Sequence, residues 1–128
     1  MESHQIANRS SRGKLSSLPT AHKNLRFRRE FTVEEYDRLA RGVIPQAMED
    51  KWFIFLEAEY LYFHRSWTGF LIYQIRLNKE GEKYFVDETL VNREPEQYKA
   101  TDDEYDVTFL GFLIDNLLLG KQTPFPRP

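Results

Sequence analysis

Four runs of aromatic and branched residues lie close together in the middle of the chain, and only short polar segments separate them. The runs cover residues 52–56, 60–64, 70–77 and 84–91. Residues of these types favour extended structure, and such short connections join neighbouring antiparallel strands. The sequence therefore predicts a four-stranded antiparallel meander, with its turns at alternating ends of the sheet.

A short N-terminal helix is predicted before the meander. Thr32 and Glu35 have the spacing of a capping box, in which the side chain of each residue accepts a hydrogen bond from the backbone of the other. Gly42 tolerates the left-handed conformation in which helices commonly end. These signals predict a helix over Val33–Arg41.

A long C-terminal helix is predicted after the meander. Thr101 and Glu104 have the spacing of a second capping box, apolar residues follow at helical spacing, and Gly120 ends the run. Because little polar surface remains, we expect this helix to pack across the sheet. The predicted fold class is α+β, with a four-stranded antiparallel meander, a short N-terminal helix and a long C-terminal helix.

Positive charge is concentrated at the start of the chain. Residues 1–30 hold seven Lys or Arg and two Glu, a balance of +5, and residues 31–128 have a balance of −7. The first segment also has few large apolar residues. We therefore expect a basic, flexible N-terminal arm over residues 1–30, one α+β domain over residues 31–120 and a proline-rich tail over residues 121–128.

The arm has other interpretations besides flexibility. Arg26, Arg28 and Arg29 surround Phe27, and alternating basic and aromatic residues can bind nucleic acid. Four residues make a small footprint for such binding. Docking of the arm on a partner protein or across the domain itself is the remaining interpretation.

The composition argues against several classes of protein. Without cysteine, the chain has no disulfide, thiolate zinc site or cysteine nucleophile. No signal-peptide pattern precedes the domain, and the apolar runs are far shorter than the roughly 20 residues of a membrane span. The acidic residues at 102–106 lack the pattern of a calcium loop and suit a helix N-terminus. We expect a cytoplasmic protein without membrane contact, cofactor or metal.

The connection between the second and third predicted strands has the sequence HRSWTG. In a meander it lies at the same end of the sheet as the segment before residue 52 and the segment after residue 91. We therefore expect a composite ligand- or partner-binding site at this end. Its candidate residues are His64, Arg65, Ser66, Trp67 and Thr68, together with Asn92, Arg93, Gln97 and Tyr98.

Both binding and structural roles are open for these residues. The tryptophan and tyrosine could stack on a ring, and the two arginines could pair with phosphate or carboxylate oxygens. Alternatively, Trp67 folds back as a lid on the core, for which Gly69 would make room. Arg65 would then pair at the surface with Glu94 or Asp103.

Three stretches of the chain resemble a family of small, mostly bacterial proteins of uncharacterised activity. They are MEDKWFIFLEAEYLYFHRSWTGFLIYQIRL, VNREPEQYKATDDEYD and FLIDNLLLG, and the shared pattern covers roughly residues 31–120. The resemblance predicts that the chain is a member of this family. It implies no substrate and no catalytic residue.

The chain carries none of the common hydrolase, Walker or dinucleotide-binding motifs. Trp, Tyr and Arg, which are enriched at binding hot spots, gather in the converging loops instead. We therefore expect a non-enzymatic recognition module that binds a partner protein or a small anionic ligand through the HRSWTG end, in bacterial stress or defence regulation. The alternative is a nucleotide-type ligand-binding protein or small enzyme acting on an ADP-ribose derivative, with His64 as its acid or base and Arg65 on phosphate.

Overall fold

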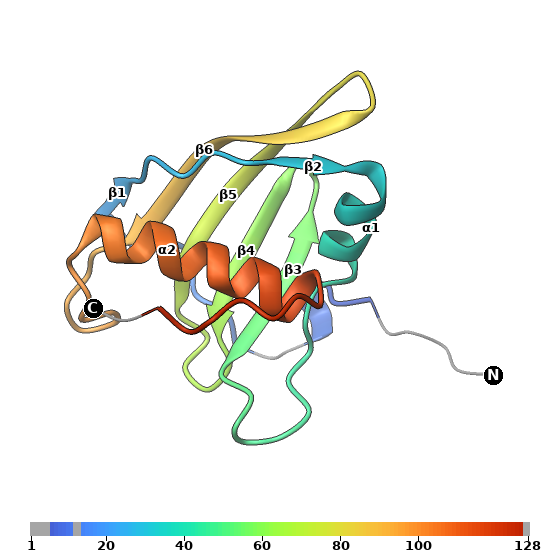
Figure 1. Cartoon of the computed structure of the whole chain (residues 1–128). Helices are drawn as coiled ribbons and strands as arrows, with labels where there is room; N and C mark the ends of the chain where they lie inside the picture. The colour runs from blue at the N-terminus through green and yellow to red at the C-terminus, as the bar shows by residue number, and fades with distance from the viewer. Residues whose placement is uncertain (1–5, 12–13, 127–128) are drawn as a thin grey trace.

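A six-stranded antiparallel sheet carries a helix across one of its faces (Figure 1). The computed structural model describes residues 6–11 and 14–126. The strands are β1 (His22–Asn24), β2 (Glu30–Thr32), β3 (Trp52–Glu57), β4 (Tyr60–Arg65), β5 (Leu71–Glu80) and β6 (Lys83–Asn92). The helices are a 3-10 helix (Arg9–Ser11), α1 (Val33–Arg41) and α2 (Asp103–Leu113), which a π-helical turn (Ile114–Leu118) continues.

The four central strands form the predicted meander, but the count of four is wrong. The strand order is β1-β6-β5-β4-β3, and β2 pairs with β6 near its opposite end. Lys23 of β1 lies opposite Val91, and Phe31 of β2 lies opposite Tyr84. Each added strand has three residues, too few to show the alternation by which a strand is recognised in sequence.

The helix predicted over Val33–Arg41 is present with its capping box. The Glu35 backbone N–H donates to Thr32 Oγ1 at 3.1 Å, and the Thr32 N–H donates to the Glu35 carboxylate at 3.0 Å. Its placement as the N-terminal element of the fold is wrong, because the 3-10 helix, β1 and β2 all precede it. The high content of basic residues in this region favoured a flexible arm over these short elements in the sequence analysis.

The N-cap of helix α2 lies one residue later than predicted. Asp102, not Thr101, is the N-cap, and its carboxylate accepts the backbone N–H groups of Glu104 at 3.0 Å and Tyr105 at 3.2 Å. A carboxylate at this position also interacts favourably with the positive end of the helix dipole. Within the described residues, no helix is long and apolar enough to cross a membrane.

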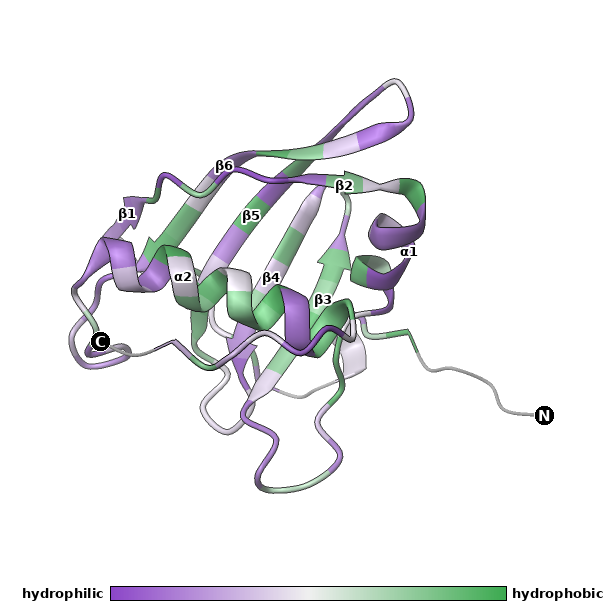
Figure 2. Ribbon diagram, in the orientation of Figure 1, coloured by the Kyte–Doolittle hydropathy of each residue, from purple (hydrophilic) through white to green (hydrophobic). Residues whose placement is uncertain are grey.

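The main hydrophobic core lies between the sheet and α2. Figure 2 shows hydrophilic residues in the first turns of α2 and hydrophobic residues farther along, where it crosses the sheet. Burial of this apolar face is the principal stabilising contribution that holds the helix on the strands. Fully buried residues here include Ile54, Leu61, Phe63, Tyr73, Ile75, Val91, Leu110 and Ile114.

Part of the segment predicted as an N-terminal arm packs against the rest of the domain. Leu25 and Phe27 are buried in the main core, because they alternate with arginines that face outward. Ala7 lies on the opposite face of the sheet, in a second small cluster with Phe53 and Phe55. Residues 1–5 and 12–13, also part of the predicted arm, lie outside the described residues.

The described part of the C-terminal tail packs beside α2. The Phe125 ring contacts the rings of Phe109 and Phe112, with centroid distances of 5.8 and 5.0 Å. The Thr123 hydroxyl donates to Asp115 at 2.8 Å. Residues 127–128 of the predicted tail lie outside the described residues.

Candidate functional site

The HRSWTG connection joins β4 to β5 and is bound to the segment that precedes β3. The Ser66 backbone N–H donates to the Lys51 carbonyl at 2.9 Å, and its hydroxyl donates to the Asp50 carbonyl at 2.6 Å. The Trp67 indole N–H donates to the Met48 carbonyl at 3.0 Å. These bonds hold two loops together at one end of the sheet.

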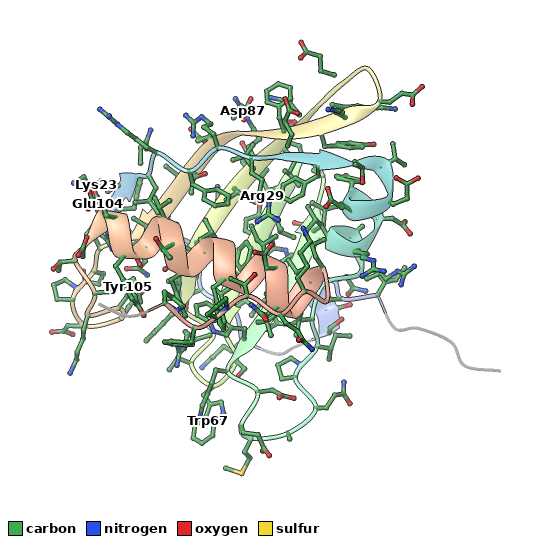
Figure 3. The ribbon with its side chains drawn as sticks, viewed as in Figure 1. Lys23, Arg29, Trp67, Asp87, Glu104 and Tyr105 are labelled. Atoms are coloured by element: carbon green, nitrogen blue, oxygen red, sulfur yellow. The ribbon has the colours of Figure 1, made fainter. Side chains whose placement is uncertain are left out.

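Trp67 projects from this end of the molecule, away from the sheet (Figure 3). Its side chain is 64% exposed, and the neighbouring Met48 is 71% exposed. The Lys51 ammonium lies 5.1 Å from the centre of the indole ring. Trp67 is therefore not the lid on the core that was one interpretation of the sequence.

Gly69 makes room for the N-terminal segment. Its φ is +78°, and a Cβ at this position would lie 2.1 Å from the Lys14 carbonyl oxygen. The Ser16 N–H donates to the Gly69 carbonyl at 3.0 Å. The approach of Lys14 and the positive φ both require glycine here.

His64 is buried on the face of the sheet opposite α2. Its side chain packs among Phe53, Phe55 and Tyr62, with the Phe55 ring stacked at 5.7 Å. The residue is 2% exposed, and Nδ1 donates to the Gly69 carbonyl at 2.8 Å. Burial holds the pKa of the imidazole below its usual value. This geometry favours a neutral, structural histidine.

Arg65 stacks on the core tryptophan, with its guanidinium 5.1 Å from the centre of the Trp52 ring. It also lines a pocket of about 180 Å³. Lys14 and Leu15 of the N-terminal segment line the pocket as well. Further lining residues are Phe53, Ser66, Trp67 and Thr68.

Asn92 and Gln97 are occupied in fixing the segment after β6. The Asn92 side-chain amide donates to the Leu71 carbonyl at 2.8 Å and to Gln97 Oε1 at 2.9 Å. Its Oδ1 accepts the Glu94 N–H at 2.8 Å. Because Asn92 is completely buried, these bonds satisfy polar groups that have no access to water.

Arg93 and Tyr98 belong to a cluster around the fully buried Asp106. Arg93 donates to Asp106 and to Asp103, each at 2.6 Å. The other Asp106 oxygen accepts the hydroxyls of Tyr73 at 2.6 Å and Tyr98 at 2.5 Å. Burial, strengthened by the hydrogen bond to this carboxylate, raises the pKa of Tyr98 above its usual value. We call these five residues the Asp106 cluster.

A row of aromatic rings separates the two halves of the predicted site. Arg65 lies on Trp52, Trp52 stacks on Tyr73 at 6.2 Å, and Tyr73 meets Tyr98 at 6.2 Å. No hydrogen bond or ion pair between described residues joins Arg65, Trp67 or Thr68 to the Asp106 cluster. The sheet brings both halves to one end without forming a single site.

Sequence reasoning missed three residues beside Trp67. Met48 and Lys51 contact its indole ring, and Lys14 lines the same pocket as Trp67. No local sequence pattern marks these residues. Comparison of the chain with protein-family models, curated proteins and solved structures found no match in any of the three. The family resemblance stays a prediction, so that any function must be inferred from the residues themselves.

Proposed function

We propose that the protein is a non-enzymatic recognition module that binds a segment of a partner protein. The contact residues are Met48, Lys51, Arg65, Trp67 and Thr68, which we call the Trp67 surface. The observation that supports this most strongly is an exposed tryptophan whose position is fixed by its own hydrogen bond. Participation in stress or defence regulation stays a prediction.

A tryptophan that is exposed but held in one position points to binding, because burial of its ring contributes little to the stability of the fold. The indole buries only about a third of its surface, yet the bond to Met48 and the anchoring of Ser66 hold the loop in place. Tryptophan is enriched at binding hot spots, and a side chain that is already ordered loses less entropy on binding. These properties suit a preformed contact for a partner.

The nucleotide-type alternative receives less support from the geometry. His64 is buried, with its Nδ1 bonded to a carbonyl, and Arg93 is neutralised by two carboxylates. Arg65 is the remaining candidate of that alternative for phosphate binding. We expect no shift in the melting temperature with ADP-ribose or NAD, whereas a shift abolished by Arg65→Gln would favour the alternative.

A peptide selection tests the proposed function. Short random peptides displayed on phage are selected on the wild-type protein, and those that also bind Trp67→Ala are removed. We expect enriched peptides whose affinity for Trp67→Ala is at least about tenfold weaker, the loss of a typical hot spot. Phe125→Ala is the control, since Phe125 is similarly exposed at 61% but lies on the C-terminal tail.

Two results would contradict the proposal. One is selection without any peptide that distinguishes the wild-type protein from Trp67→Ala. The other is a loss of affinity in Phe125→Ala as large as the loss in Trp67→Ala, because the selected peptides would then recognise exposed aromatic residues in general.

A further inference from the structure

The tail after α2 is attached to the helix at Thr123. Residues 121–126 return beside α2 (Figure 1). The Asn116 side-chain amide donates to the Thr123 carbonyl at 3.1 Å, and the Thr123 hydroxyl donates to Asp115 at 2.8 Å. Two of the next three residues are prolines, which have no backbone N–H, and no hydrogen bond between described residues holds any of the three. Beyond Thr123, the tail is therefore held by the packing of its side chains alone.

Three aromatic rings on α2 contact or adjoin this end of the tail. Tyr105, Phe109 and Phe112 share one face of the helix, and successive rings are nearly parallel, with interplanar angles of 12° and 14°. The Phe125 ring meets Phe109 and Phe112 edge-on, and the following Pro126 is buried. Proline-rich segments bind to grooves that are lined by aromatic rings. We call the three rings of α2 the aromatic row.

The tail does not fill the space beside the aromatic row. A cavity of about 310 Å³ is lined by Phe109 and Phe112 of the row, by Phe125 of the tail and, on its other side, by residues 49–51 of the segment before β3. Apolar cavities of about 150 Å³ already hold a benzene ring, so that this one has room for a large apolar side chain. Phe125 and Leu117 line the cavity and are still 61% and 41% exposed. The tail is therefore an incomplete occupant of this site.

We propose that the aromatic row binds a proline-containing segment of a partner protein, and that the tail competes with this segment for the same site. The segment places an aromatic residue between prolines where Phe125 lies, and a large apolar side chain in the cavity. The tail of a second copy would leave the cavity as it is, which is why a partner fits this site better. The site shares Lys51 with the Trp67 surface but does not include Trp67, so that this inference does not depend on the proposed function.

Two peptides and a variant with a weakened tail test the competition. In the double variant Thr123→Ala, Phe125→Ala, the tail lacks the hydroxyl and the ring that hold it, and the aromatic row is unchanged. The 15N-labelled full-length protein is titrated with the peptide KQTPFP, which has the sequence of residues 121–126, and separately with KQTPAP. We expect KQTPFP to produce saturable shifts at the Asn116 side-chain amide and the Phe112 backbone N–H.

The affinities should differ in two ways. KQTPFP should bind the double variant at least about tenfold more tightly than the wild-type protein, because a site that the tail occupies most of the time has a reduced apparent affinity. KQTPAP should bind the double variant at least about tenfold more weakly than KQTPFP, because it lacks the aromatic anchor.

Two further substitutions in the double variant locate the binding site. Phe112→Ala should weaken the binding of KQTPFP by about tenfold. Trp67→Ala is the matched control, because it removes an aromatic ring outside the row, and it should leave the affinity unchanged. The melting temperature shows whether each variant is folded. If Phe112→Ala unfolds the protein, Phe112→Leu, which keeps an apolar side chain without the ring, takes its place.

Five results would overturn the inference. Three concern the peptides: no saturable shift in the double variant, equal affinities of the two peptides, or equal affinities of the double variant and the wild-type protein. The fourth is a loss of binding in Trp67→Ala as large as that in Phe112→Ala. The fifth is a wild-type dimer, detected by sedimentation, that the double variant does not form, because the occupant would then be the tail of a second copy.

A selection of peptides displayed on phage tests the cavity. The sequence Pro-Phe-Pro is fixed, the positions on both sides are random, and the double variant is the target. We expect the enriched peptides to carry a large apolar residue at one position and to bind at least about tenfold more tightly than KQTPFP. Enriched peptides that bind no more tightly than KQTPFP would contradict a partner segment that fills the cavity.

Discussion

Two arginines at one end of the same sheet have opposite surroundings. Arg93 is 13% exposed and is held by Asp103 and Asp106, whereas Arg65 has an aromatic ring beneath it and no carboxylate among the described residues. The row of Trp52 and Tyr73 lies between them. The ion pairs of Arg93 stabilise the fold, whereas the guanidinium of Arg65 forms no ion pair with a described residue.

Removing the carboxylate of the Asp106 cluster should have the largest effect. Asp106→Ala leaves the Arg93 guanidinium and two phenols without their shared acceptor. We expect the free energy of unfolding to fall by about 3–5 kcal/mol, as when one partner of a buried pair is removed. Urea unfolding measures the change. For Arg65→Ala, at a site without an ion pair, we expect a loss below about 1 kcal/mol. An equally small loss for Asp106→Ala would contradict the distinction between the two arginines.

The contact between the N-terminal segment and Gly69 should be the next most sensitive. Gly69→Ala combines a positive φ with a collision against Lys14, and we expect a loss of about 1–3 kcal/mol. Gly81→Ala is a matched control, since Gly81 has a φ of +64° and open space around its Cβ position. The difference between the two variants in urea unfolding isolates the Lys14 contact. Equal losses would mean that the contact contributes nothing.

A smaller effect depends on pH. His64 is neutral in the folded protein because burial lowers its pKa, and it takes up a proton near pH 6.5 once the chain unfolds. Stability from this group is therefore complete above pH 6.5 and is lost progressively as the pH falls below that value. His64→Asn keeps an N–H donor and does not titrate. Its free energy of unfolding should decline less than that of the wild-type protein between pH 7.5 and 5, and parallel declines would contradict the assignment.

Much of the fold follows from local sequence. The strands at 52–91 were predictable because aromatic and branched residues occur there in unbroken runs, and α1 was predictable from Thr32 and Glu35. β1 and β2 were not, because each has only three residues and is defined by its pairing with β6. The alternation of Leu25 and Phe27 with arginines was a usable signal that positive charge obscured.

The topology of the meander was predictable, but the contacts that each loop residue makes were not. The meander topology correctly brings the HRSWTG connection and the segment after β6 to one end of the sheet. Sequence could not show that Asp103 pairs with Arg93 and not with Arg65, because Arg65 ends one strand and Arg93 follows another at that end of the sheet. The exposure of Trp67 likewise depends on the loop containing Met48, which no local pattern positions.

The smallest expected change in stability belongs to Trp67, and it provides the most direct test of whether this residue serves recognition. The affinity for a selected peptide and the free energy of unfolding are measured on the same preparation of Trp67→Ala. We predict an affinity at least about tenfold weaker and a free energy of unfolding lower by no more than about 1 kcal/mol, the loss of the hydrogen bond to Met48. Unchanged affinity, or a loss of stability as large as the loss of binding energy, would contradict a recognition role for Trp67.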